Sequence, residues 1–94
     1  MDNYYFIGSH CEIDNRIELN RLGQKVCLSP EVASIVIAGG GAILPEHIWE
    51  QLSFTPEELS DYAFPGQRAT APAAFLEKYQ AALTAYHDLA KGGA

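Results

Sequence analysis

The chain has 94 residues, of which 48% are hydrophobic and 19% are charged, and its formal net charge is −6. This length predicts a single domain with a thin core, and the composition is typical of a globular protein rather than a disordered one. The charge distribution argues against nucleic-acid binding, because no Lys or Arg occurs between residues 26 and 67 to neutralise phosphates.

The first 28 residues predict a three-stranded antiparallel meander. Residues 4–13 are rich in aromatic and β-branched side chains and predict one strand, bulged near Gly8. Apolar and polar residues alternate over 16–20, which predicts the second strand, and residues 25–28 predict a short third strand. We expect these strands to form a small SH3-like or barrel-like sheet.

The loop between the first two strands can be predicted from the side chains that it would pair. A two-residue loop would place apolar residues opposite polar ones. A three-residue loop over residues 14–16 pairs Ile13 with Ile17. It also pairs Cys11 with Leu19, so that the apolar side chains share one face of the hairpin. We therefore predict the three-residue loop.

Three Pro-Glu steps predict the starts of short helices over residues 30–38, 45–52 and 56–63. Proline at the first helical position loses no hydrogen bond, and the following glutamate favours the positive end of the helix dipole. The first helix is apolar nearly all round and is expected to be buried. Thr55 and Glu58 have the spacing of a capping box at the third helix.

The triple glycine at residues 39–41 has two interpretations. A phosphate-binding loop would need free backbone N–H groups at a helix start, usually with a lysine nearby. These glycines follow a helix instead, so we interpret them as its stop signal. Residues 42–44 are compatible with a further short strand.

The C-terminal third predicts a loop followed by the longest helix. Residues 64–72 contain two prolines, and an apolar stripe at spacings of three and four follows over about 72–90. We expect an α+β fold in which residues 1–63 form the meander with its short helices. Residues 73–94 would form the C-terminal helix of the same domain, either packed on that domain or docked on a partner.

Two groups of residues resemble catalytic or metal sites without meeting the required geometry. His10 and Cys11 point to opposite faces of a strand, and with Cys27 they fall short of the ligand set that zinc needs. His47 and Glu50 could form an acid–base pair, but polar positions on an amphipathic helix explain them as well. We predict no catalytic, cofactor-binding or metal-binding residue.

The sequence predicts neither a signal peptide nor a membrane span. Residues 1–6 carry no basic region, and no apolar run approaches the roughly 20 residues that cross a bilayer. Cys11 and Cys27 do not form a disulfide framework. We expect an intracellular location in which both thiols stay reduced.

Aromatic side chains are the candidates for contacts with other proteins. Three consecutive aromatic residues in the first strand must place at least one away from the core, and Tyr is favoured at interfaces. Burial under a loop or under the last helix is the alternative. The candidate interface residues are Tyr4, Tyr5, Phe6, Trp49, Tyr79 and Tyr86.

One segment resembles a known group of proteins. Its pattern is Gly23-x-x-Val26-x-Leu28-Ser29-Pro30-Glu31-x-Ala33, followed by Ile35, residues 39–42 and Pro45. This pattern is similar to that of small structural proteins of tailed phages and prophages, as are residues 54–59 and 71–73. The resemblance implies a neck, tail or capsid-decorating component that is found in the virion or the host cytoplasm.

We therefore expect a non-enzymatic, oligomeric assembly protein that contacts virion proteins or itself. No nucleic acid, membrane or small-molecule partner is expected. The alternative hypothesis is a small acidic adaptor or inhibitor that blocks a basic surface of a host protein. A small enzyme is a third hypothesis, and it would need a cleft that holds polar groups with shifted pKa values.

Overall fold

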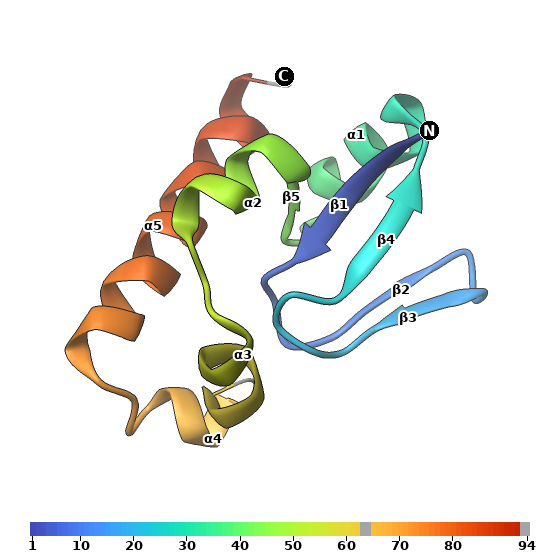
Figure 1. Cartoon of the computed structure of the whole chain (residues 1–94). Coiled ribbons are helices and arrows are strands. Elements are labelled where there is room, and N and C mark those ends of the chain that lie inside the picture. The colour runs from blue at the N-terminus through green and yellow to red at the C-terminus, as the bar shows by residue number, and fades with distance from the viewer. Residues whose placement is uncertain (63–64, 93–94) are drawn as a thin grey trace.

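The structure, a computed structural model, describes residues 1–62 and 65–92 and shows an α+β protein (Figure 1). Antiparallel strands occupy the N-terminal half, and a long helix ends the described chain. The elements are β1 (Asp2–Phe6), β2 (Cys11–Ile13), β3 (Ile17–Leu19), β4 (Lys25–Leu28), α1 (Pro30–Ala38), β5 (Ile43–Pro45), α2 (Glu46–Leu52), α3 (Pro56–Tyr62), α4 (Pro65–Arg68) and α5 (Ala73–Gly92).

The strands form two sheets, so the predicted meander is wrong. The main sheet has the order β4-β1-β5, and β2 and β3 form a separate hairpin. The end of β1 is fastened to the turn before β4, because the Phe6 amide donates to the Gln24 carbonyl over 3.0 Å. The Gly23 amide donates back to the Phe6 carbonyl over 2.7 Å. Because β1 pairs with both β4 and β5, it lies at the centre of the main sheet, and β3 pairs with β2 and not with β4.

The hairpin has the predicted register. Ile13 lies opposite Ile17 and Cys11 lies opposite Leu19. Two residues of the three-residue loop, at positions 14 and 15, adopt left-handed backbone angles with φ of 52° and 58°. Asp and Asn tolerate this conformation better than most residues, which explains why the turn forms here.

The single strand predicted over residues 4–13 is instead two strands in different sheets. The chain leaves the main sheet after Phe6, and β2 begins at Cys11 in the other sheet. A Cβ atom at Gly8 would lie 2.9 Å from Cζ of Phe6, so only glycine fits this close approach. The aromatic and β-branched pattern does not reveal this break.

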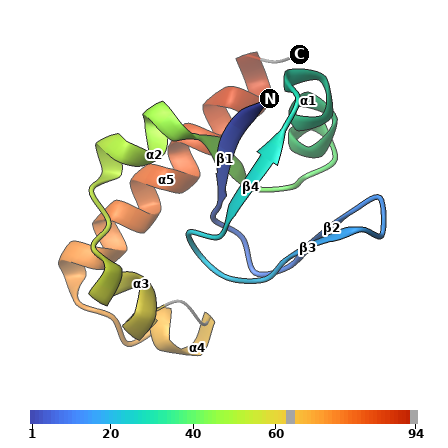
Figure 2. The same cartoon turned by 45° about the vertical axis from the view of Figure 1, so that its right-hand side comes forward.

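The main sheet separates two clusters of buried side chains. Even-numbered residues of β1 face the first cluster, which the hairpin and α1 cover (Figure 2). The second cluster lies on the other face, under α2 and α5. The first cluster contains Tyr4, Phe6, Ile13, Leu19, Val26, Leu28, Ala33 and Ile43. The second contains Ile7, Leu22, Leu44, Trp49, Phe75, Ala82 and Tyr86.

The first helix, α1, has its predicted bounds but is not buried on all sides. Only Ala33 is buried, and the side chain of Ile35 is 71% exposed. A small domain lacks the elements to cover every face of such a helix, so part of its apolar surface stays in solvent.

The predicted start and stop of α1 are confirmed, because Pro30 is its first residue and Gly39 is its C-cap. The Ser29 hydroxyl caps α1 by accepting from the Val32 amide over 3.3 Å. Three glycine amides then end α1, donating to the carbonyls of Ile35, Ile37 and Val36 in turn. These amides are engaged by the helix that precedes them, as the stop-signal interpretation predicts. At α2 the predicted start is wrong by one residue, because Pro45 ends β5 and is the N-cap of the helix.

The capping box of α3 also forms. The Thr55 amide donates to Glu58 Oε1 over 3.0 Å, and the Glu58 amide donates to the Thr55 hydroxyl over 3.1 Å. The structure describes α3 as far as Tyr62, so residue 63 of the predicted helix lies outside the described residues. The predicted loop over 64–72 is wrong in part, because residues 65–68 form α4, and residue 64 lies outside the described residues.

The last helix packs on its own chain. Lys78 of α5 bridges to Glu58 over 2.7 Å and to the Ser53 carbonyl over 2.9 Å. The Tyr79 hydroxyl donates to the Ile7 carbonyl over 3.2 Å. These contacts reach α3, the loop before it and the loop after β1, so α5 and the sheet belong to one packed unit. Residues 93 and 94 of the predicted helix region lie outside the described residues.

Candidate protein-binding groove

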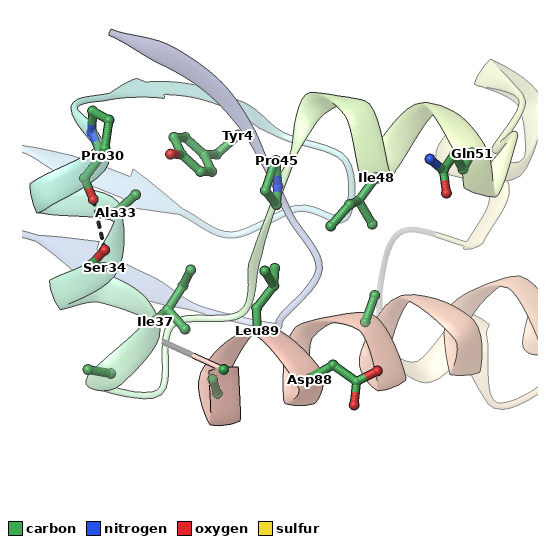
Figure 3. Close-up of a pocket in the computed structure, with 14 residues that line it drawn as sticks. Tyr4, Pro30, Ala33, Ser34, Ile37, Pro45, Ile48, Gln51, Asp88 and Leu89 are labelled. Atoms are coloured by element: carbon green, nitrogen blue, oxygen red, sulfur yellow. Dashed lines mark hydrogen bonds between the residues drawn. The ribbon is translucent and has the colours of Figure 1, made fainter. Parts of the chain in front are cut away.

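Three helices border a groove of about 960 Å³ beside the free edge of β5 (Figure 3). Helix α1 forms one wall, α5 runs along the bottom and α2 forms the opposite side, with β1 and β5 behind. The segments come from both ends and the middle of the chain. The groove therefore exists only in the folded protein.

The α1 wall follows from helical periodicity. Its lining residues are Pro30, Ala33, Ser34, Ile37 and Ala38, which recur at spacings of three and four and so share one face. The Ser34 hydroxyl donates to the Pro30 carbonyl over 3.0 Å, the one hydrogen bond drawn within the groove in Figure 3. Because this hydroxyl has a partner on its own helix, the wall presents mainly apolar surface.

The back of the groove consists of Tyr4 from β1 and Pro45 from β5, which lie opposite each other in the sheet. Burial raises the pKa of the Tyr4 phenol, and the nearby negative charge of Asp2 adds to the effect. The phenol therefore stays protonated at neutral pH. Pro45 has no backbone N–H, so this position of β5 offers no donor to an added strand.

The remaining walls come from α2 and α5. Ile48 and Gln51 line the groove from α2, whereas Ala85, Asp88, Leu89, Ala90 and Gly92 line it from α5. Of the described lining residues, Asp88 alone carries a charge at neutral pH. Its side chain is exposed, as are those of Gln51 and Ala90, so the groove opens to solvent. The arrangement can bind an apolar side chain flanked by a hydrogen-bond donor.

The six aromatic candidates serve mainly intrachain packing. Phe6 is 1% exposed and lies in the first cluster. Tyr5 stacks on Trp49 with ring centroids 5.1 Å apart, and its hydroxyl donates to Glu46 over 3.3 Å. Trp49 in turn stacks on Phe54 at 4.9 Å. Burial chiefly, and then the Glu46 carboxylate, raise the pKa of the Tyr5 phenol.

The other candidates lie on α5 or in the groove. Tyr79 hydrogen-bonds to the first loop, and the Arg68 guanidinium carbon lies 4.9 Å from its ring centroid. Tyr86 is 8% exposed and donates to the Ile37 carbonyl over 3.3 Å. Tyr4, also 8% exposed, is the one of the six that lines the groove.

The residues considered for catalysis are not brought together. His10 is exposed on the hairpin, where its Nε2 lies 3.4 Å from Glu18. Cys11 is half-buried, and burial followed by the charge of Glu12 raises the pKa of its thiol, which makes it a poor nucleophile. Cys27 is exposed on β4, in the other sheet.

His47 and Glu50 are both exposed on α2, and neither lines the groove. Among residues 1–62 and 65–92, no three His, Cys, Asp or Glu side chains are grouped so that they could hold a metal ion. In the same part of the chain, no helix combines the length and the apolar character needed to cross a membrane.

Sequence reasoning missed most of the groove. Its lining is dominated by small and aliphatic side chains such as Ala33, Ile37 and Ile48, whereas the sequence predicts aromatic residues as the interface candidates. The usable signal was α1 itself, which carries more apolar residues than one buried face requires. Comparison with protein families, curated proteins and solved structures finds no match to this chain.

Proposed function

We propose that the protein is a non-enzymatic assembly component that binds another protein through the groove between α1, α2 and α5. The observation that carries this proposal is the character of the lining, which is largely aliphatic, open to solvent and built from three helices. Grooves of this kind suit the apolar face of a partner segment. The exposed aliphatic surface would be covered in the complex.

The chemistry of the lining supports binding over catalysis. Acid–base catalysis needs two groups with matched roles and pKa values. The described lining offers one carboxylate, Asp88, and one phenol, Tyr4, whose raised pKa keeps it protonated. The described lining therefore lacks a matched pair of acid and base groups, which favours recognition as the role of the groove.

We place this component in a phage or prophage particle, as a capsid-decorating, neck or tail protein. The support is the resemblance of residues 23–45 to such proteins, together with a surface suited to protein contacts. We also propose that the main sheet and the hairpin together form an SH3-like unit. The support is the hairpin, whose inner face packs over one side of the main sheet.

Two matched variants test this role. Ala90 and Ala81 are both exposed alanines of α5, but only Ala90 lines the groove. Particles would be purified from cells that make the wild-type chain, Ala90→Arg or Ala81→Arg at equal levels, and each chain would be quantified by mass spectrometry.

We expect wild type and Ala81→Arg to copurify with particles. Ala90→Arg should be depleted by at least ten-fold, which corresponds to a loss of about 1.4 kcal/mol of binding free energy. Absence of the wild-type chain from particles would overturn the particle role. Equal incorporation of Ala90→Arg would overturn the groove as the binding surface.

A further inference from the structure

The charges around the groove indicate what kind of segment it binds, an inference that rests on the proposed function. Asp88 is the charged residue among the described lining, and α1, β5 and α2 belong to a stretch without Lys or Arg. That stretch places Glu31 next to Pro30 on α1 and Glu50 next to Gln51 on α2, both exposed. On α5, the exposed side chains of His87 and Lys91 adjoin the lining residues Asp88 and Ala90 in the sequence.

Among the lining residues and their neighbours in the sequence, the carboxylates of Glu31, Glu46, Glu50 and Asp88 outnumber Lys91, which is the one lysine or arginine of this set. Complementary electrostatic potentials on two partners direct their association, and like charges disfavour it. The protein itself carries a net charge of −6, so a second copy would bring further negative charge to this site. The electrostatics favour a different, basic partner.

The geometry favours a helix over a strand in the groove. An added strand would need unpaired backbone donors along an edge, and the position of β5 that faces the groove is Pro45, which has none. The walls instead offer rows of side chains. Lining residues span Pro30–Ala38 on α1 and residues 85–92 on α5, which correspond to about 12 Å and 10 Å at 1.5 Å per residue.

We propose that the groove binds an amphipathic helical segment with two to three turns of apolar side chains, flanked by a Lys or Arg that pairs with Asp88. The apolar residues, spaced by three and four, would contact Ile37, Ile48 and Leu89. The basic residue at the rim would select the partner and fix its direction in the groove.

The test uses three synthetic 18-residue peptides as probes. They share one Leu and Ala stripe at helical spacing and carry Lys, Gln or Glu at the flanking positions. Each is titrated into ¹⁵N-labelled protein, with amide shifts mapping the site and fluorescence anisotropy giving Kd. The variant is Asp88→Lys, and its control is Glu77→Lys, which makes the same charge change at an exposed site three turns away on α5.

We expect the Lys peptide to shift groove amides and to bind at least about five-fold more tightly than the Glu peptide, as one or two exposed ion pairs would give. Asp88→Lys should remove that preference, and Glu77→Lys should keep it. If the three peptides bind the groove equally tightly, the proposal that the partner is basic is wrong, but the groove remains a binding site.

Two further outcomes count against the inference. If nuclear Overhauser contacts show that the bound peptide has an extended conformation, the proposal that the groove binds a helix is wrong. A homodimer in light scattering that Ala90→Arg dissociates would show that the occupant is a second copy. A third outcome concerns the protein amides that shift when peptide is added. If these amides lie outside the groove, and Ala90→Arg does not change their shifts, the result would count against the proposed function itself.

Discussion

The hydroxyl of Tyr86 donates a hydrogen bond to the main-chain carbonyl of Ile37, although the two residues lie 49 positions apart. The bond ties α5 to the last turn of α1, where both helices border the groove. Tyr86 is 8% exposed, and the bond is partly buried. The bond is therefore one of the contacts that join the two helices beside the groove.

Replacing Tyr86 with Phe tests that link. The ring would keep its packing and the hydroxyl would be lost, so we expect the free energy of unfolding to fall by about 1 kcal/mol. Urea denaturation followed by circular dichroism measures it. An unchanged free energy would mean that the hydroxyl does not hold the two helices together.

Gly23 is a second position where the packing depends on one residue. Its φ is +82°, and an added Cβ would lie 3.1 Å from Leu59 and 3.2 Å from Trp49. We expect Gly23→Ala to lower the free energy of unfolding by about 1–2 kcal/mol, because the left-handed backbone disfavours a Cβ atom.

The control is Gly66→Ala, since a Cβ there meets no atom within 4 Å. It lies within α4, where alanine is tolerated better than glycine. The comparison uses thermal and urea unfolding of both variants. Equal losses at the two positions would show that the turn before β4 is not constrained as described.

The α1 helix provides a test of which of its faces is covered. Ile35 is 71% exposed, whereas Ile37 is partly buried between the two clusters and lines the groove. We expect Ile35→Ala to change the free energy of unfolding by no more than about 0.5 kcal/mol. Ile37→Ala should cost about 2 kcal/mol. The reverse order would contradict the orientation of α1.

Glu58 makes the free energy of unfolding depend on pH in the acidic range. Its hydrogen bond from Lys78 is the largest cause that lowers its pKa below the ordinary value of 4.5, and the Thr55 amide adds to the effect. A depressed pKa in the folded state stabilises the protein above the unfolded pKa, and that stabilisation is lost as pH falls through the folded value.

We therefore expect the free energy of unfolding of the wild type to decrease from pH 5 downwards more steeply than that of Glu58→Gln. Glu57→Gln is the control, because Glu57 is exposed and lies outside the capping box. Urea unfolding at several pH values measures both. Parallel pH profiles for wild type and Glu58→Gln would show that the carboxylate does not carry this stabilisation.

The sequence predicted the features that depend on near neighbours. The hairpin register follows from which of Ile13, Ile17 and Leu19 can share a face. The capping box needs only Thr55 and Glu58, which are three residues apart. Local hydrogen bonds of this kind form wherever their residues occur at the right spacing.

The order of the main sheet could not be predicted in the same way. It depends on pairing Asp2 with Leu28 and Phe6 with Ile43, which are distant in the sequence. A pattern of apolar residues says that a segment is a strand and not which strand lies beside it. The groove was missed for the same reason, because its walls meet only after α1, α2 and α5 are assembled.

The most direct test of groove binding is site-specific photo-crosslinking at two glutamines. Gln51 and Gln80 are both exposed, but only Gln51 lines the groove. A photoreactive amino acid would replace either residue in cells that assemble particles, and crosslinked products would be identified by mass spectrometry. We expect position 51 to crosslink to one protein of the particle and position 80 to give no such product. A partner captured from position 80 and not from position 51 would contradict the assignment of this groove as the binding surface.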